Sequence, residues 1–143
     1  MSIGTKMNMR FSNQELAAAT HLKRSGLPWE PAVGNYVYDA GGLVKPSSPF
    51  QPGVYFLLNY DCFMQRVGGL AQFKSIMAWL PTWHDARSLL SAFGIGAAEI
   101  QSRLVQTNAL EQGTELLELY QLLANCLHEP TPTAALRDVG EIS

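Results

Sequence analysis

Hydrophobic positions near the start of the chain recur at helical spacing and carry helix signals at both ends. Ser12 can cap the helix, and Glu15 three residues later completes a capping box. Gly26 suits the left-handed residue that ends a helix, and Leu27 after it can pack back onto the last turn in a Schellman motif. We therefore predict a helix over residues 13–25.

The next segments have the composition of strands. Residues 35–38 are rich in β-branched and aromatic types, and the turn residues at 39–42 would let 43–44 return as the second strand of a short hairpin. Several prolines between 45 and 53 then indicate an irregular loop. The almost continuous apolar run at 54–58 predicts a strand that is buried on both faces and covered by helices.

A helix and an ambiguous segment follow. Asn59 and Asp61 both suit the N-cap of a helix that two glycines later interrupt. The apolar residues after those glycines keep helical spacing, but 76–80 also has the length of a buried strand, and a short apolar run does not separate the two. We favour a helix to about Lys74 followed by a strand.

The C-terminal third of the chain has helical spacing throughout. Thr82 and Asp85 form a second capping box, and Gly94 ends that helix by the same left-handed device. Two further helices are predicted, one over 97–106 and one that begins near Asn108 and closes before Pro130.

These elements predict one α+β domain over residues 1–129, with a small sheet of three to four strands interleaved with helices and a helical C-terminal third. Residues 130–143 are predicted to be a loosely ordered tail. A chain of 143 residues can bury roughly two thirds of its unfolded surface in a single core, which leaves no room for a second domain.

Charge and composition narrow the classes of partner. The net charge of −2 gives no broad positive field, so nucleic-acid binding is not expected. Only 15% of residues are charged, which permits a self-association face, and a homodimer is predicted. The polar start lacks the apolar core of a signal peptide, and no run approaches the ~20 apolar residues of a membrane span. With two cysteines only, we expect a reducing, cytoplasmic location.

Cys62 is the candidate nucleophile. It lies in the first turn of a predicted helix, where the helix dipole and free amides lower a thiol pKa. Its base would be His84 or His128. The structural alternative is a buried cysteine that follows an apolar strand. A metal site would need histidines and cysteines to converge from distant segments, so neither a metal nor a cofactor is predicted.

Aromatic residues are the better lead to function. Tryptophan and tyrosine join a large contact area to a polar tip, which suits a ligand or partner face as well as a core. The leading hypothesis is therefore a non-enzymatic binding domain for a small molecule or a protein partner, and the rival is a small cysteine-dependent enzyme. The candidate binding residues are Trp29, Tyr36, Tyr38, Tyr55 and Trp83.

Four short pieces of the sequence, at 28–31, 34–38, 54–58 and 79–83, read Pro-Trp-Glu-Pro, Gly-Asn-Tyr-Val-Tyr, Val-Tyr-Phe-Leu-Leu and Trp-Leu-Pro-Thr-Trp. In that order they are similar to small bacterial and phage-type proteins of unknown function. The resemblance covers about half of the chain, from 27 to 90. It implies a compact accessory protein and no particular activity, cofactor or catalytic residue.

Overall fold

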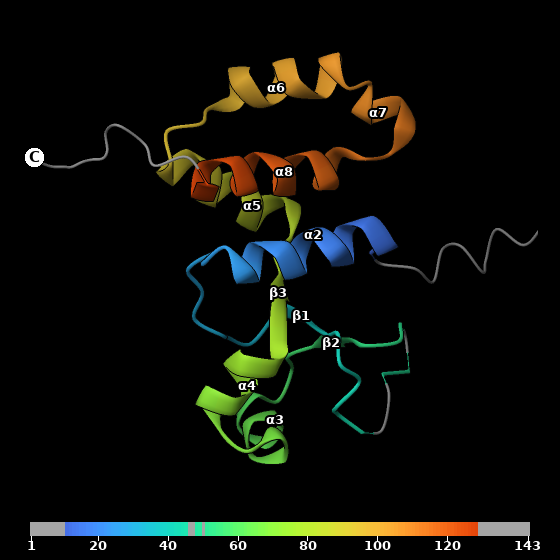
Figure 1. The fold of residues 1–143 in the computed structure, drawn as a ribbon, viewed down its shortest axis with the longest axis vertical. Coiled ribbons are helices and arrows are strands. Elements are labelled where there is room, and N and C mark those ends of the chain that lie inside the picture. The colour runs from blue at the N-terminus through green and yellow to red at the C-terminus, as the bar shows by residue number, and fades with distance from the viewer. Residues whose placement is uncertain (1–10, 46–47, 50, 129–143) are drawn as a thin grey trace, which may run out of the picture.

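The structure, a computed structural model, describes residues 11–45, 48–49 and 51–128. The predicted α+β class is confirmed, and so is the helical C-terminal third. The predicted tail at 130–143 lies outside the described residues. In chain order the elements are α2 (Asn13–Arg24), β1 (Tyr36–Asp39), β2 (Val54–Phe56), α3 (Tyr60–Val67), α4 (Leu70–Ile76), β3 (Met77–Leu80), α5 (Trp83–Ala92), α6 (Ala97–Gln106), α7 (Ala109–Gln112) and α8 (Glu115–His128) (Figure 1).

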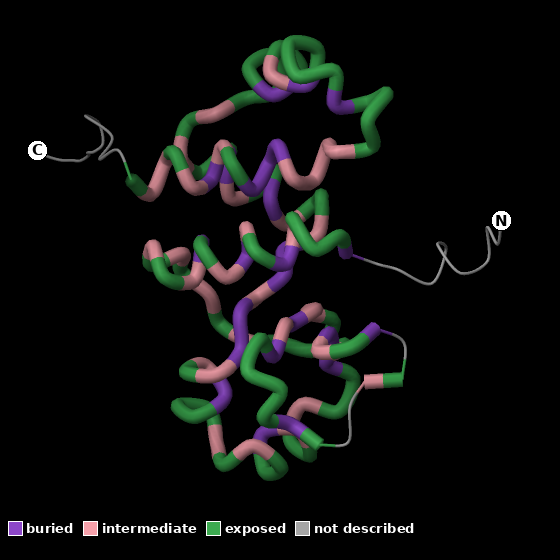
Figure 2. Tube along the Cα trace, turned by 45° about the vertical axis from the view of Figure 1, so that its right-hand side comes forward, coloured by how far each residue is buried: buried purple, intermediate pink, exposed green. Residues whose placement is uncertain are grey.

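The sheet separates two hydrophobic cores. Its central strand β1 pairs antiparallel with β2 on one side and β3 on the other. Because side chains alternate along a strand, Tyr36 and Tyr38 join the core formed with α2, α5 and α8, whereas Val37 joins the core formed with α3 and α4. Figure 2 shows the buried run of β3 crossing the middle of the molecule between these two cores.

Local capping signals place the helix ends as predicted. Ser12 Oγ accepts from the Glu15 amide at 3.0 Å, and Glu15 Oε1 accepts from the Ser12 amide at 2.9 Å. At the other end Gly26 has φ +90°, and the Leu27 amide donates to the Leu22 carbonyl at 3.1 Å. Helix α5 begins and ends in the same way, at Thr82 with Asp85 and at Gly94 with Ile95.

The predicted hairpin between 35–38 and 43–44 is wrong. Both edges of β1 are already paired with β2 and β3, so no edge remains for the segment that follows the turn. Asp39, which is only 3% exposed, holds that segment instead: its Oδ2 accepts from the Val44 amide at 2.8 Å.

The prediction that 54–58 is a strand buried on both faces is also wrong. The strand is shorter, Val54–Phe56, and forms an edge of the sheet. Val54 is fully buried, but Phe56 is 41% exposed and Leu58, beyond the strand, is 75% exposed. An edge strand has a neighbour on one side only, and a continuous apolar run does not reveal this.

The predictions for the ambiguous segment and for the last helix have different outcomes. For the ambiguous segment, the favoured interpretation is confirmed, since α4 runs two residues past Lys74 and β3 follows at once. The single last helix is wrong, because Gly113 at φ +71° divides it into α7 and α8. Asn108 has φ +57° and makes no side-chain cap bond, although α6 before it matches its predicted bounds.

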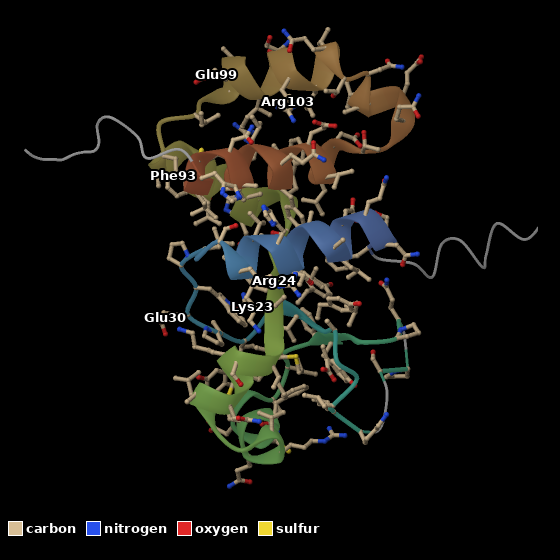
Figure 3. The ribbon with its side chains drawn as sticks, in the orientation of Figure 1. Lys23, Arg24, Glu30, Phe93, Glu99 and Arg103 are labelled. Atoms are coloured by element: carbon tan, nitrogen blue, oxygen red, sulfur yellow. The ribbon has the colours of Figure 1, made fainter. Side chains whose placement is uncertain are left out.

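Helix α6 is held against α8 by a half-buried ion pair. Arg103 Nε donates to Glu118 Oε1 at 2.8 Å, and its Nη2 donates to Gln121 Oε1 at 3.2 Å. Figure 3 shows Arg103 in the space between the two helices. Two hydrogen bonds from one guanidinium fix the orientation of α6 on α8 more firmly than a single ammonium contact would.

Tyr120 links α8 to the start of α5 through the core. The side chain is fully buried, its hydroxyl donates to the Pro81 carbonyl, and burial raises the pKa of the phenol. We expect Tyr120→Phe to lower the free energy of unfolding by about 1–2 kcal/mol, because Pro81 keeps a buried acceptor without a donor. Urea unfolding measures this. The control is Tyr60→Phe, whose hydroxyl has no hydrogen bond within the described residues, and equal effects of the two changes would contradict the argument.

Candidate functional site

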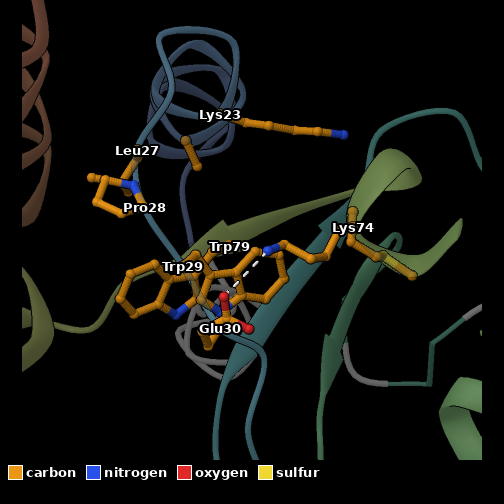
Figure 4. A pocket seen from close by; sticks show the side chains of 9 residues that line it. Lys23, Leu27, Pro28, Trp29, Glu30, Lys74 and Trp79 are labelled. Carbon is orange, nitrogen blue, oxygen red and sulfur yellow. Dashed lines mark ion pairs between the residues drawn. The ribbon is translucent and has the colours of Figure 1, made fainter. Parts of the chain in front are cut away.

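A cleft of about 400 Å³ opens where the end of α2 faces α4 and β3 (Figure 4). Its walls combine two tryptophans, an aliphatic floor and three charged side chains. The lining residues are Ala19, Lys23, Leu27, Pro28, Trp29, Glu30, Lys74, Met77 and Trp79.

Local chain geometry places Trp29 in this cleft. The Schellman end of α2 turns the chain away from the helix, and a proline on either side of the Trp29–Glu30 pair keeps the segment extended. The indole Nε1 donates to Asn35 Oδ1 at 3.1 Å, and the same oxygen accepts from the Ala32 amide at 2.8 Å. The indole is therefore fixed by a turn rather than free to rotate.

Two parallel indoles form one wall of the cleft. The rings of Trp29 and Trp79 have centroids 6.0 Å apart and planes that differ by 6°, which is an offset stack. Phe73 supports Trp29 from the core side at 5.8 Å. Trp79 Nε1 is buried and has no hydrogen-bond acceptor within the part of the chain that the structure describes.

Charged side chains from three segments line the rim. Lys74 Nζ lies 3.7 Å from Glu30 Oε2, and both side chains are well exposed, at 41% and 86% (Figure 4). Such a pair contributes about 0–1 kcal/mol. Lys23 reaches across from α2 and donates to the Ser75 carbonyl at 2.6 Å. Burial lowers the pKa of Lys23, and the neighbouring Arg24 lowers it further.

The candidate aromatics do not form a single surface. Trp29 lines the cleft, whereas half-buried Tyr36 and Tyr38 point into the opposite core. Tyr55 is half-buried on the α3 side of the sheet and packs edge-on against Phe63. Trp83 is exposed at the start of α5, where it borders separate shallow hollows.

The structure does not bring Cys62 to a candidate base. Cys62 is exposed in the first turn of α3, and its amide donates to Asn59 Oδ1 at 3.1 Å. His84 and His128 lie on α5 and α8, which Figures 1 and 2 place toward the opposite end of the long axis from α3. The thiol and these imidazoles therefore belong to separate parts of the molecule, and His128 lies beside His21 instead.

Four charged or aromatic residues of the cleft were not among the sequence candidates. Lys23 was not a candidate because a cation at the C-terminal end of a helix is explained by the helix dipole alone. Glu30 and Lys74 lie on ordinary polar positions, and Trp79 has the pattern of a strand core. The pairing of Pro-Trp-Glu-Pro with a later Trp-Leu-Pro is the sequence signal that could have indicated this wall.

Comparisons with known proteins name no relative. No family model matches the chain, and no curated protein or solved structure matches it. In the described ranges, the structure shows no helix long and apolar enough to cross a membrane, and no group of three or more metal-binding side chains. The functional argument therefore depends on the geometry of the cleft.

Proposed function

We propose that the protein is a non-enzymatic binding domain and that its ligand is a small molecule with a flat apolar part and one anionic group. The observation that carries this proposal is the parallel stack of Trp29 and Trp79 beside two lysines in one cleft. Three further proposals rest on composition and charge alone: a cytoplasmic location, a homodimer and the lack of a nucleic-acid partner.

The apolar part of the proposed ligand is inferred from the residues that form the walls of the cleft. Ligand clefts of about 300–1,000 Å³ are lined mainly by apolar and aromatic groups with a few polar contacts, and this cleft has that size and lining. Trp29 is held by Asn35 and Phe73, so little side-chain entropy is lost when a flat ligand packs against it.

The anionic half follows from the rim. Lys23 and Lys74 outnumber Glu30, and the exposed Lys74–Glu30 contact is weak enough for a ligand anion to replace it. Lys23 is partly desolvated in the free protein, so an anion beside it would offset a cost that the fold already carries.

The test uses two fluorescent probes that differ in charge. 8-Anilinonaphthalene-1-sulfonate is flat, apolar and anionic, and N-phenyl-1-naphthylamine is its uncharged analogue. We expect Lys23→Gln to weaken binding of the sulfonate about fivefold, which corresponds to about 1 kcal/mol, and to leave the uncharged probe unchanged. Glu30→Gln should strengthen sulfonate binding about twofold to threefold, because it removes the one carboxylate among the described residues that line the cleft.

Trp29→Ala should weaken the binding of both probes at least tenfold, because each probe loses the indole wall against which it packs. Trp83→Ala is the matched control, since it removes an exposed tryptophan outside the cleft. Thermal unfolding of each variant checks that the fold is intact. Equal losses in the two tryptophan variants, or no loss in Trp29→Ala, would show that the probes bind elsewhere.

A further inference from the structure

Two histidines that are 107 residues apart in sequence meet on the surface between α2 and α8. The Nε2 atoms of His21 and His128 lie 2.9 Å apart, and the ring planes differ by 30°. With ring centres 5.0 Å apart, the two nitrogens face each other in a hydrogen bond, in which one ring donates its N–H and the other accepts. Ser25 Oγ lies 3.4 Å from the same His128 nitrogen, so three polar atoms gather from two helix ends.

We propose that His21 and His128 form a two-imidazole site for a divalent transition-metal ion, with the Ser25 hydroxyl and water as the remaining ligands. This site lies outside the tryptophan cleft and is independent of the proposed ligand. The bound ion connects the end of α2 to the end of α8 and thereby stabilises the packing of these two helices.

The spacing of the nitrogens fits two ligands of one ion. Nitrogens bound at 2.0–2.1 Å are about 2.9 Å apart when the angle at the metal is 90°, and about 3.4 Å apart when it is tetrahedral. The observed 2.9 Å equals the first value. The ion takes the place of the hydrogen-bonding proton, which is released to water, and it lies beside the line that joins the nitrogens. Each ring therefore turns by about 45° so that its Nε2 lone pair is directed at the ion. Both residues are exposed, so water can complete the coordination shell.

Helix electrostatics favour a cation at this point. Glu15 of the first turn of α2 and Glu115 at the start of α8 line the same surface hollow. The N-terminal ends of α2 and α8 are therefore neighbours, the histidines join the C-terminal ends, and the helices run parallel (Figure 1). The negative ends of two helix dipoles then meet at the site.

Two cationic side chains of α2 are close to His21 in the described sequence, and the imidazole ligands determine which metal ions are favoured. Arg24 belongs to the same last turn of α2 and is exposed, whereas Lys23 is directed away to the Ser75 carbonyl. Imidazole nitrogens favour Zn²⁺, Ni²⁺ and Cu²⁺ over the oxygen-seeking Mg²⁺ and Ca²⁺. Ni²⁺ is a suitable probe, because it tests the imidazoles without oxidising the thiols of Cys62 and Cys126.

The experiment measures thermal unfolding with and without NiCl₂. At a Ni²⁺ concentration of about 100 times Kd, the Tm of the unaltered chain should rise by about 5–10 °C, since folding brings together two ligands that are 107 residues apart and the folded state therefore binds the ion more tightly. His21→Asn and His128→Asn should each abolish the rise. His84→Asn, which removes the third histidine of the chain, should keep it, as should Cys126→Ser. EDTA should reverse the rise, and MgCl₂ should give none.

A second measurement avoids substitutions. In the unaltered protein, paramagnetic Ni²⁺ should broaden the ring-proton NMR signals of His21 and His128 before that of His84. The proposal is overturned if millimolar Ni²⁺ leaves the Tm unchanged, if the rise persists in both histidine variants, or if all three histidine signals broaden together. Probe binding in the tryptophan cleft is a separate readout and should not change with Ni²⁺.

Discussion

Replacing Phe73 with alanine is expected to lower the free energy of unfolding by about 3–5 kcal/mol and to abolish probe binding in the tryptophan cleft. Phe73 is fully buried in the middle of α4. Its ring meets Trp29 at 5.8 Å and Phe63 edge-on at 5.7 Å, so one truncation removes two aromatic contacts and leaves a cavity. Trp29 then loses the support that holds it parallel to Trp79.

Urea unfolding followed by circular dichroism gives the stability change, and 8-anilinonaphthalene-1-sulfonate fluorescence gives the binding change at urea concentrations where the variant is folded. Leu70→Ala is the matched control, because Leu70 belongs to the same helix but is well exposed. It should cost less than about 1 kcal/mol and leave binding intact. If Phe73→Ala loses stability but binds the probe normally, Phe73 does not support the cleft wall.

Helix ends were the part of the fold that the sequence predicted best, and the reason is physical. A capping box or Schellman motif is completed within about six residues, as in the bonds between Ser12 and Glu15 and between Leu22 and Leu27. Tertiary context has little scope to override such a motif. The exceptions lie at the two ends of α7. Asn108 makes no side-chain cap bond, and Gly113, a glycine inside an amphipathic pattern, ended one helix and allowed another to begin.

Strand pairing was predicted poorly because it is not local. Residues 43–44 are adjacent to β1 in sequence, yet the central strand pairs with β2 and with β3, which begins almost 40 residues after β1 ends. The alternation along a short strand shows that it has two faces. It does not show which edges are occupied, and this decided both the failed hairpin and the exposure of Phe56.

The residues of the candidate site show the same difference between local and non-local information. Trp29 could be proposed from residue type alone, because tryptophan joins a large contact area to a polar tip. Lys23, Lys74 and Glu30 each have a plain local explanation, and only the packing of α2 over α4 and β3 gathers them. The two-histidine contact has the same origin, since the packing of α2 against α8 brings its members together.

Replacing Gly53 with alanine is expected to destabilise the protein by about 2–4 kcal/mol. Gly53 has φ +79°, which costs an alanine about 1–2 kcal/mol by itself. A Cβ there would also lie 3.0 Å from Tyr38 Cε1 and 3.3 Å from the Asp39 carbonyl oxygen. The Asp39 amide donates to the Gly53 carbonyl at 2.8 Å, so the backbone cannot retreat without loss of a bond between β1 and the start of β2.

Gly42→Ala separates the two causes of that loss. Gly42 also has positive φ, +63°, but its added Cβ would meet nothing within 4 Å. Its cost should therefore be the backbone cost alone, about 1–2 kcal/mol, and the difference between the two variants measures the close approach of Gly53 to the central strand. Urea unfolding midpoints, with m-values that stay unchanged, give the loss of unfolding free energy in each variant. Equal losses would mean that Tyr38 moves aside freely, and the tight packing of β2 against β1 would then be refuted.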